Sequence, residues 1–155
     1  MARLRAMSLE VHAPVSGGLS SLEDAPDPIF SMGVVGWGVA LDPAREAISV
    51  VAPIDGKIER IEPHVFSIAH DRGAVMVQVG IKTDGLKGEG YTVHKAIGDE
   101  VRQGDPIISW NPAEVEAKGL VPLVLVVVIG KELKELSGLR TSGRAEVGDV
   151  LFTSA

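Results

Sequence analysis

The sequence predicts an all-β fold, a flattened antiparallel β-sandwich or barrel that contains one short helix. Short segments in which apolar and polar residues alternate recur along the chain, and turns rich in glycine and proline separate them at near-regular spacing. Many short strands of this kind are typical of sandwiches and barrels. Internal repeats in the sequence further indicate that the fold consists of two similar, interlocked β units.

The first repeat relates residues 13–22 to residues 52–61. Both segments begin with Ala-Pro, contain a Ser-Gly or Asp-Gly pair, and continue with alternating hydrophobic residues. Each segment therefore predicts a strand, a turn and a returning strand. The second repeat relates residues 104–109 to residues 148–153, which both begin with Gly-Asp and continue as a hydrophobic strand.

Two prolines shape the segment at residues 25–31. Pro26 and Pro28 cannot donate to a sheet ladder, so they exclude a central strand and favour an extended loop that displays its side chains. In such a loop, Ile29 and Phe30 are either half exposed or cap the end of the core.

The functional centre is expected at residues 77–83 and on through residues 86–91. Hydrophobic residues alternate with polar or small ones from residue 77 to residue 82. This alternation predicts a strand with Gln78 on its outward side. A second alternating segment, residues 63–67, contains His64 and is joined to the first through a polar turn at residues 70–73. Two strands joined in this way bring His64 and Gln78 within reach of each other.

A short helix is predicted at residues 111–119. Asn111 can cap the free amide groups of the first turn, Pro112 suits the first helical position, and Gly119 can end the helix. Residues 131–136 indicate one or two further helical turns.

Composition indicates a single domain. The 155 residues suffice for one sizeable core, and we expect a tail at residues 1–10 followed by a domain at residues 11–155. The absence of cysteine excludes disulfides and thiolate metal sites, and it is compatible with a reducing cytoplasm. The formal charge of −6 argues against nucleic-acid binding and favours a basic partner protein.

No hydrophobic run reaches the length of a membrane span. The longest run, residues 121–129, is the size of a strand and contains Pro122. The start of the chain lacks the apolar stretch of a signal peptide, and either Met1 or Met7 is the native start. We therefore expect a cytoplasmic location without membrane insertion.

The two strands of the expected centre resemble the IIA-glucose family of the phosphoenolpyruvate-dependent sugar phosphotransferase system. The family pattern has a first histidine in a segment like residues 64–67, His-Val-Phe-Ser. It continues with Val-His-x-Gly-Ile-Asp-Thr and Leu-x-Gly-x-Gly-aromatic, which residues 77–83 and 86–91 match except at two positions. The resemblance extends from about residue 11 to about residue 152, and it implies a fold of the duplicated hybrid motif type.

Gln78 stands where the family has its phosphorylated histidine. An imidazole nitrogen can take a phosphoryl group because it has a free lone pair, whereas the amide nitrogen of glutamine donates its lone pair into the carbonyl. Gln78 is therefore predicted not to accept a phosphoryl group. It can still hydrogen-bond His64 and hold the pocket in the shape of the unphosphorylated form.

Lys82 is the second departure, at a position where the family has an aspartate that helps receive an arginine of the histidine phosphocarrier protein. A lysine there sets like charges opposite each other, although a flexible lysine on a rim can also turn into water. By the same resemblance, Asp27 and Phe30 match an acidic residue and an aromatic residue of the partner-docking surface. Phe66 is expected on the same face.

These observations favour a IIA-glucose-like component that is non-phosphorylatable or regulatory and binds protein partners. The alternative is an active phosphocarrier in which His64 accepts the phosphoryl group and passes it to a IIB domain, so whether the protein is an enzyme stays open. The resemblance implies the histidine phosphocarrier protein and a IIB domain as partners, with sugar permeases or other regulatory targets as further candidates. No cofactor or metal is expected, because one of the paired histidines that the family uses for zinc is missing.

Overall fold

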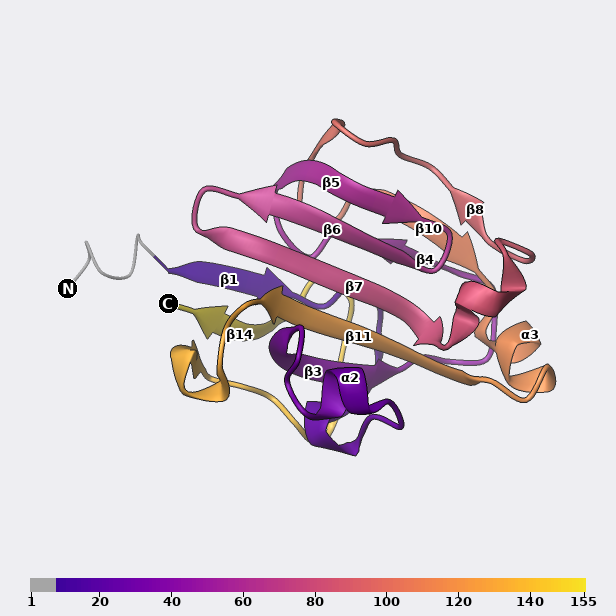
Figure 1. The fold of residues 1–155 in the computed structure, drawn as a ribbon, viewed down its shortest axis with the longest axis horizontal. Helices are drawn as coiled ribbons and strands as arrows, with labels where there is room; N and C mark the ends of the chain where they lie inside the picture. Colours follow the sequence, from indigo (N-terminus) through magenta and orange to yellow (C-terminus); the bar gives the residue numbers. More distant parts are fainter. Residues whose placement is uncertain (1–7) are drawn as a thin grey trace.

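The computed structural model describes residues 8–155, which form three antiparallel sheets. The largest has eight strands in the order β13-β2-β3-β11-β7-β6-β5-β9, and its long central strands cross the molecule in Figure 1. Two three-stranded sheets, β1-β14-β12 and β4-β10-β8, complete a fold of the predicted all-β class. The large sheet contains β2 (Gly17–Ser21), β3 (Gly36–Asp42), β5 (Gly56–Glu62), β6 (Val65–His70), β7 (Gly73–Ile81), β9 (Glu100–Val101), β11 (Val121–Ile129) and β13 (Arg144–Ala145). The smaller sheets contain β1 (Leu9–His12), β4 (Ile48–Val51), β8 (Thr92–Val93), β10 (Pro106–Trp110), β12 (Leu136–Ser137) and β14 (Val150–Ser154).

Short helical segments connect the strands. The predicted helix is α3, where Asn111 Oδ1 accepts a hydrogen bond of 3.0 Å from Ala113 N and Pro112 is the first helical residue. Residues 131–136 contribute only a single 3-10 turn before the chain enters β12. The helical segments are η1 (Leu22–Asp24), α2 (Pro28–Ser31), η2 (Thr83–Leu86), α3 (Pro112–Ala117) and η3 (Leu133–Glu135).

The predicted boundary between tail and domain differs from the structure by two residues. Residues 1–7 of the expected tail lie outside the described part of the chain. Leu9 and Glu10 belong to β1, and the Leu9 side chain is buried in the core. The sheet therefore begins before residue 11.

The large sheet is covered on both faces along β11 and β7. In β11, Val124, Val126 and Val128 face the main core, whereas Leu125 and Val127 face a second hydrophobic cluster. Side chains of a strand alternate between the two faces, so a run of apolar residues fits a strand that is buried on both sides. The second cluster also contains Phe30 of α2, which places this helix over one face of the sheet.

The first repeat does not form the expected hairpins. β1 pairs with β14, and β2 pairs with β3 and β13, so residues 13–16 carry the chain from one sheet to another. In the same way β4 pairs with β10 and β8, whereas β5 pairs with β6 and β9. A proline at the centre of each connection cannot donate to a ladder, which favours a change of sheet over a tight hairpin.

The two repeat units nevertheless interlock as predicted. His12 N donates to Pro53 O over 3.0 Å, and Val51 N donates reciprocally to Pro14 O over 2.9 Å. These two bonds relate the units by an approximate twofold arrangement.

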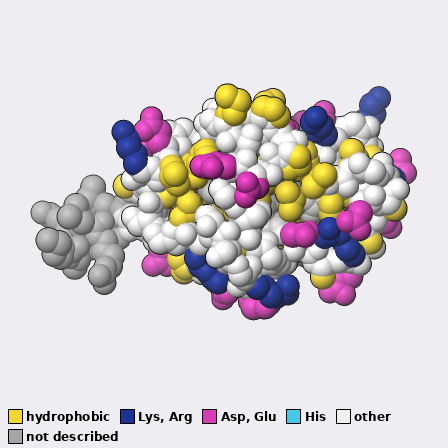
Figure 2. Space-filling model, turned by 90° about the horizontal axis from the view of Figure 1, so that it is seen from below, with side chains coloured by type: hydrophobic (Ala, Val, Ile, Leu, Met, Phe, Trp, Pro, Cys, Tyr) yellow, Lys and Arg dark blue, Asp and Glu magenta, His cyan; other side chains and the backbone are white. Residues whose placement is uncertain are grey.

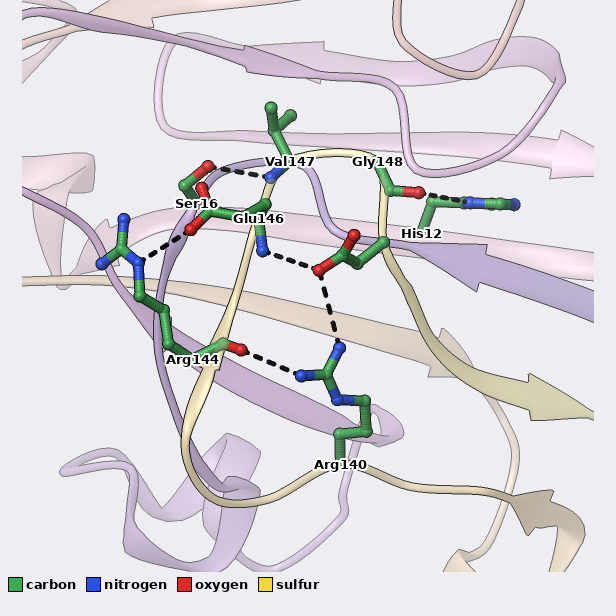
Figure 3. A network of polar contacts seen from close by, with 8 residues as sticks. His12, Ser16, Arg140, Arg144, Glu146, Val147 and Gly148 are labelled. Carbon is green, nitrogen blue, oxygen red and sulfur yellow. Dashed lines mark hydrogen bonds and ion pairs between the residues drawn. The ribbon is translucent and has the colours of Figure 1, made fainter.

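The Gly-Asp turns of the second repeat bind the Ala-Pro segments of the first. Ala13 N donates to Asp149 O over 2.8 Å, and Ala52 N donates to Asp105 O over the same distance. Figure 3 shows this corner, where Ser16 Oγ accepts a hydrogen bond of 2.8 Å from Val147 N. Asp55 plays the matching part in the other unit, since its Oδ1 accepts a hydrogen bond from Gln103 N.

Candidate functional site

A cavity of about 560 Å³ opens between α2, the end of β5, the end of β7 and η2. His64 lies in the turn between β5 and β6, and Gln78 lies on β7 opposite Val65 of β6. The structure therefore brings His64 and Gln78 to one site. The residues that line the cavity are Asp27, Ile29, Phe30, Val35, Arg60, Glu62, His64, Met76, Gln78, Lys82 and Asp84.

One wall of the cavity is formed by α2, in place of the extended loop predicted there. Pro28 is the first helical residue, a position where its missing N–H has no helical partner to lose. Asp27 caps the helix, and its Oδ1 accepts a hydrogen bond of 3.1 Å from Ile29 N. Ile29 and Phe30 were expected to be either half exposed or a cap on the end of the core. Ile29 is 55% exposed and fits the first alternative, whereas Phe30 is 8% exposed and fits the second.

An apolar surface continues outward from this wall. Ile29, Met32 and Val34 are 55%, 76% and 71% exposed. α2 lies at the lower edge of the molecule in Figure 1, and Figure 2 shows groups of hydrophobic side chains on this side with single charged side chains between them. We call Ile29, Met32 and Val34 the apolar rim.

Gln78 is 8% exposed, and its side chain bonds along its own strand. Gln78 Nε2 donates to Gly80 O over 3.0 Å. The expected hydrogen bond to His64 does not form, and the His64 ring makes no side-chain hydrogen bond to any residue in the range 8–155. The left-handed backbone at Gly80, with φ of 86°, turns the end of β7 and offers its carbonyl to the amide.

A polar network beneath Gln78 was not predicted from the sequence. Thr83 Oγ1 lies 2.9 Å from Val79 O and 3.2 Å from Gly80 O, and Tyr91 OH donates to Val79 O over 2.9 Å. Val79 N donates to His64 O over 2.7 Å. The peptide groups that follow Gln78 are thus held from both sides, which fixes the geometry of the site. Only the Gly-x-Gly-Tyr sequence signals this network, because glycines let the chain turn back toward β7.

The titration of Tyr91 should report this network. Burial raises the pKa of Tyr91 above the ordinary value of 10.0, and an interaction with the Thr83 hydroxyl lowers it by less. The folded state favours the neutral phenol. The contribution of Tyr91 to the stability of the fold is therefore complete below the ordinary pKa and is lost as the pH rises through the pKa of the folded state. Tyr91 is the single tyrosine of the sequence, so the change in near-ultraviolet absorbance on phenol ionisation follows it alone. A titration midpoint of Tyr91 at or below that of free tyrosine would contradict the burial.

Tyr91→Phe should lower the free energy of unfolding at neutral pH by about 1 kcal/mol, because it removes the hydrogen bond to Val79 O.

Lys82 stands at the rim of the cavity in an unusual backbone conformation. Its φ of 58° is left-handed, which is unfavourable for a lysine. Its side chain is exposed and forms no ion pair within residues 8–155. Lys82 therefore presents a positive charge, without a direct ion pair in that range, at a cavity that Asp27 and Asp84 also line.

Phe66 was expected on the docking face, and this expectation is wrong. Its side chain is 0% exposed and packs in the main core. His64 precedes β6 in a turn, so strand alternation does not relate the two residues, and Phe66 points away from the side on which Val65 contacts the second cluster.

Two further properties bear on the site. No group of three or more His, Cys, Asp or Glu residues in the described part of the chain is arranged to hold a metal ion. Among residues 8–155, no helix has the length and apolar character needed to cross a membrane.

Comparison with known proteins places the chain in a family. The family described as phosphoenolpyruvate-dependent sugar phosphotransferase system, EIIA 1, matches residues 9–133. The chain is 36% identical over 149 residues to the PTS system glucose-specific EIIA component of Haemophilus influenzae, covering 94% of this chain and 87% of that protein. The glucose-specific EIIA component of Oceanobacillus iheyensis is 28% identical over 151 residues, covering 92% and 90% of the two chains.

A longer relative and a solved structure agree with this assignment. The PTS system beta-glucoside-specific EIIBCA component of Bacillus subtilis is 31% identical over 145 residues, and 92% of this chain spans 24% of that protein's length. The structure of glucose permease IIA from Mycoplasma capricolum superposes with a TM-score of 0.81 at 25% identity, covering 94% of this chain and 95% of the other. The chain belongs to the IIA-glucose family of the sugar phosphotransferase system.

Proposed function

We propose that this protein is a non-phosphorylatable, regulatory member of the IIA-glucose family that acts in the cytoplasm by binding protein partners. The observation that carries this proposal is the carboxamide of Gln78 at the cavity, with its nitrogen donating to Gly80 O. An amide nitrogen has no lone pair for attack on phosphorus, and the neighbouring carbonyl fixes this nitrogen as a donor.

The surface around the cavity supports a docking role. Exposed apolar side chains that surround a partly polar pocket are typical of protein–protein contact sites. The apolar rim stands beside the cavity, and Asp27 and Phe30 line its wall. The partners that fit best are the histidine phosphocarrier protein and IIB domains, and sugar permeases are further candidates for regulation.

Replacing Met32 with aspartate should weaken partner binding about tenfold, because it puts a charge into an apolar contact. Met32 is 76% exposed, so the fold should be unaffected. Ile97 is 70% exposed, follows β8 and does not line the cavity, which makes Ile97→Asp the matched control. Affinities for the phosphocarrier protein and for isolated IIB domains measure the effect by titration calorimetry. Equal affinities of the two variants would place the docking surface elsewhere.

One observation favours the alternative, an active phosphocarrier that uses His64. His64 lines the cavity, is only partly buried, and has no side-chain hydrogen bond within residues 8–155 that would occupy its ring nitrogens. Incubation with phosphoenolpyruvate and the two general phosphotransferase proteins, followed by intact mass measurement, tests it. A phosphoryl group that is gained by the unaltered protein and absent from His64→Ala would establish the alternative.

A further inference from the structure

A second cavity, of about 670 Å³, opens between the sheet β4-β10-β8 and the start of α3. β8 and α3 lie at the right end of the molecule in Figure 1. None of the described residues lines both this cavity and the one at Gln78. We call it the β10 cavity, because Ser109 and Trp110 of β10 form part of its wall.

Three hydroxyl side chains form a row across the sheet at this cavity. Ser109 is paired in register with Ser49 of β4 and with Thr92 of β8, and residues directly opposite each other share one face of a sheet. Ser109 Oγ lies 3.0 Å from Ser49 Oγ and 2.7 Å from His94 Nε2. All three hydroxyl residues line the β10 cavity, which therefore offers groups that can both donate and accept hydrogen bonds.

An aromatic wall stands beside the hydroxyl row. The rings of Tyr91 and Trp110 stack with their centroids 5.9 Å apart and their planes inclined by 17°, and both residues line the cavity. The Tyr91 hydroxyl already donates to Val79 O, so its ring is the part left to meet a ligand. An apolar ring surface next to converging polar groups suits a ligand that has an apolar ring face and a polar edge.

Trp110 contributes an unsatisfied polar group to this wall. Its Nε1 is the one buried side-chain nitrogen or oxygen atom of residues 8–155 that has no hydrogen-bond partner. A buried indole N–H usually finds an acceptor, and one without a partner lowers stability. The atom is fully enclosed, so a small displacement of the cavity wall would let a ligand oxygen supply the acceptor that the chain lacks.

The charge at the β10 cavity narrows the class of ligand. Glu114 is the single charged residue among those that line it. Two basic residues near α3 are engaged elsewhere, since Arg45 pairs with Glu116 and Lys118 pairs with Glu89. An anion would be repelled by Glu114 and would meet no cation on the wall, whereas a neutral hydroxyl group can donate to the carboxylate.

We propose that the β10 cavity binds a neutral polyhydroxylated ring, which is the chemistry of a saccharide that carries no phosphate. The ring face packs on Tyr91, and the hydroxyl groups bond with Ser49, Ser109 and Glu114. The Asn111 amide adds two N–H donors, because its Oδ1 is the atom that caps α3. The binding is non-covalent, and it does not depend on the docking function proposed for the cavity at Gln78.

The two tryptophans of the chain, Trp37 and Trp110, provide a reporter and an internal control. Trp37 lies in β3, packs against the second hydrophobic cluster and does not line the β10 cavity. Nuclear magnetic resonance resolves one indole N–H signal for each ring. Millimolar glucose, galactose or cellobiose should shift the Trp110 signal and leave the Trp37 signal in place. The phosphate monoester of the sugar that binds should bind at least about tenfold more weakly than the sugar itself.

Glu114→Gln should weaken binding of the sugar about tenfold, because it removes a charged acceptor, and it should narrow the preference over the phosphate monoester. Glu116→Gln is the matched control, since Glu116 lies on the same helix, is exposed and does not line the cavity. Ser109→Ala should weaken binding about fivefold, whereas Ser137→Ala, at an exposed serine of β12, should have no effect.

Three results would overturn the proposal. The first is a Trp110 signal that none of the three sugars moves. The second is equal affinity for the sugar and its phosphate monoester, or equal losses in the two glutamate variants. The third is a Trp110 shift caused by choline and by none of the sugars, which would assign the cavity to an organic cation held by Glu114.

Discussion

Replacing Gln78 with histidine is expected to convert a protein that takes no phosphoryl group into one that takes one per chain. The Nδ1–H of an imidazole at this position can donate to Gly80 O, as Gln78 Nε2 does over 3.0 Å. Its Nε2 would then keep a free lone pair toward the cavity, which is the state that attack on phosphorus needs. Intact mass after incubation with phosphoenolpyruvate and the general phosphotransferase proteins measures the gain.

Gln78→Asn is the matched control, since it changes the side chain without adding an imidazole and should gain no mass. Adding Lys82→Asp to Gln78→His should raise the rate of charging, because it removes the like charge that faces a basic phosphodonor. A Gln78→His protein that folds, binds the phosphocarrier and still gains no mass would show that the site lacks more than an acceptor.

Gly80→Ala is expected to lower the free energy of unfolding by about 2–4 kcal/mol, through left-handed strain and overpacking together. Gly80 has φ of 86°, and a Cβ there would lie 2.5 Å from Cγ2 of the buried Thr83. To relieve this overlap, either the end of β7 or Thr83 would have to move. Both hold the Gly80 carbonyl that accepts the hydrogen bond from Gln78. Urea unfolding followed by the fluorescence of the two tryptophans measures the loss.

A matched variant at Gly85 separates the loss of stability caused by the surroundings of Gly80 from any general destabilisation by alanine. A Cβ on Gly85, in η2, meets no atom within 4 Å, so Gly85→Ala should change stability by no more than about 0.5 kcal/mol. When combined with Gln78→His, Gly80→Ala should also reduce phosphoryl acceptance, whereas Gly85→Ala should not. Equal losses for the two glycine variants would contradict the role assigned to the turn at Gly80.

Local signals in the sequence predicted part of the local structure, although residues 28–31 form α2 in place of the predicted loop. The period-two alternation around Gln78 marks β7, and the cap at Asn111 marks the start of α3. Pairing between distant strands has no such signal, since β1 pairs with β14 at the other end of the chain. The Ala-Pro repeats therefore predicted two related units correctly and their hairpins wrongly.

The candidate site shows the same division. The pattern around His64 and Gln78 identified the residues that meet at the cavity, because His64 lies in the turn just before β6 and Gln78 pairs with Val65 at the start of β6. Phe66 was misplaced because the turn that contains His64 interrupts strand alternation. The contacts of Thr83 and Tyr91 with Val79 depend on how the chain returns to β7 after residue 82, which a residue pattern does not specify.

The most direct measurement of the central claim is the intact mass of the unaltered protein after complete incubation with phosphoenolpyruvate and the general phosphotransferase proteins, with Gln78→His in a parallel reaction as the positive control. A carboxamide at position 78 predicts an unchanged mass for the unaltered protein and the gain of one phosphoryl group for the variant. A stable gain of one phosphoryl group by the unaltered protein would contradict the account.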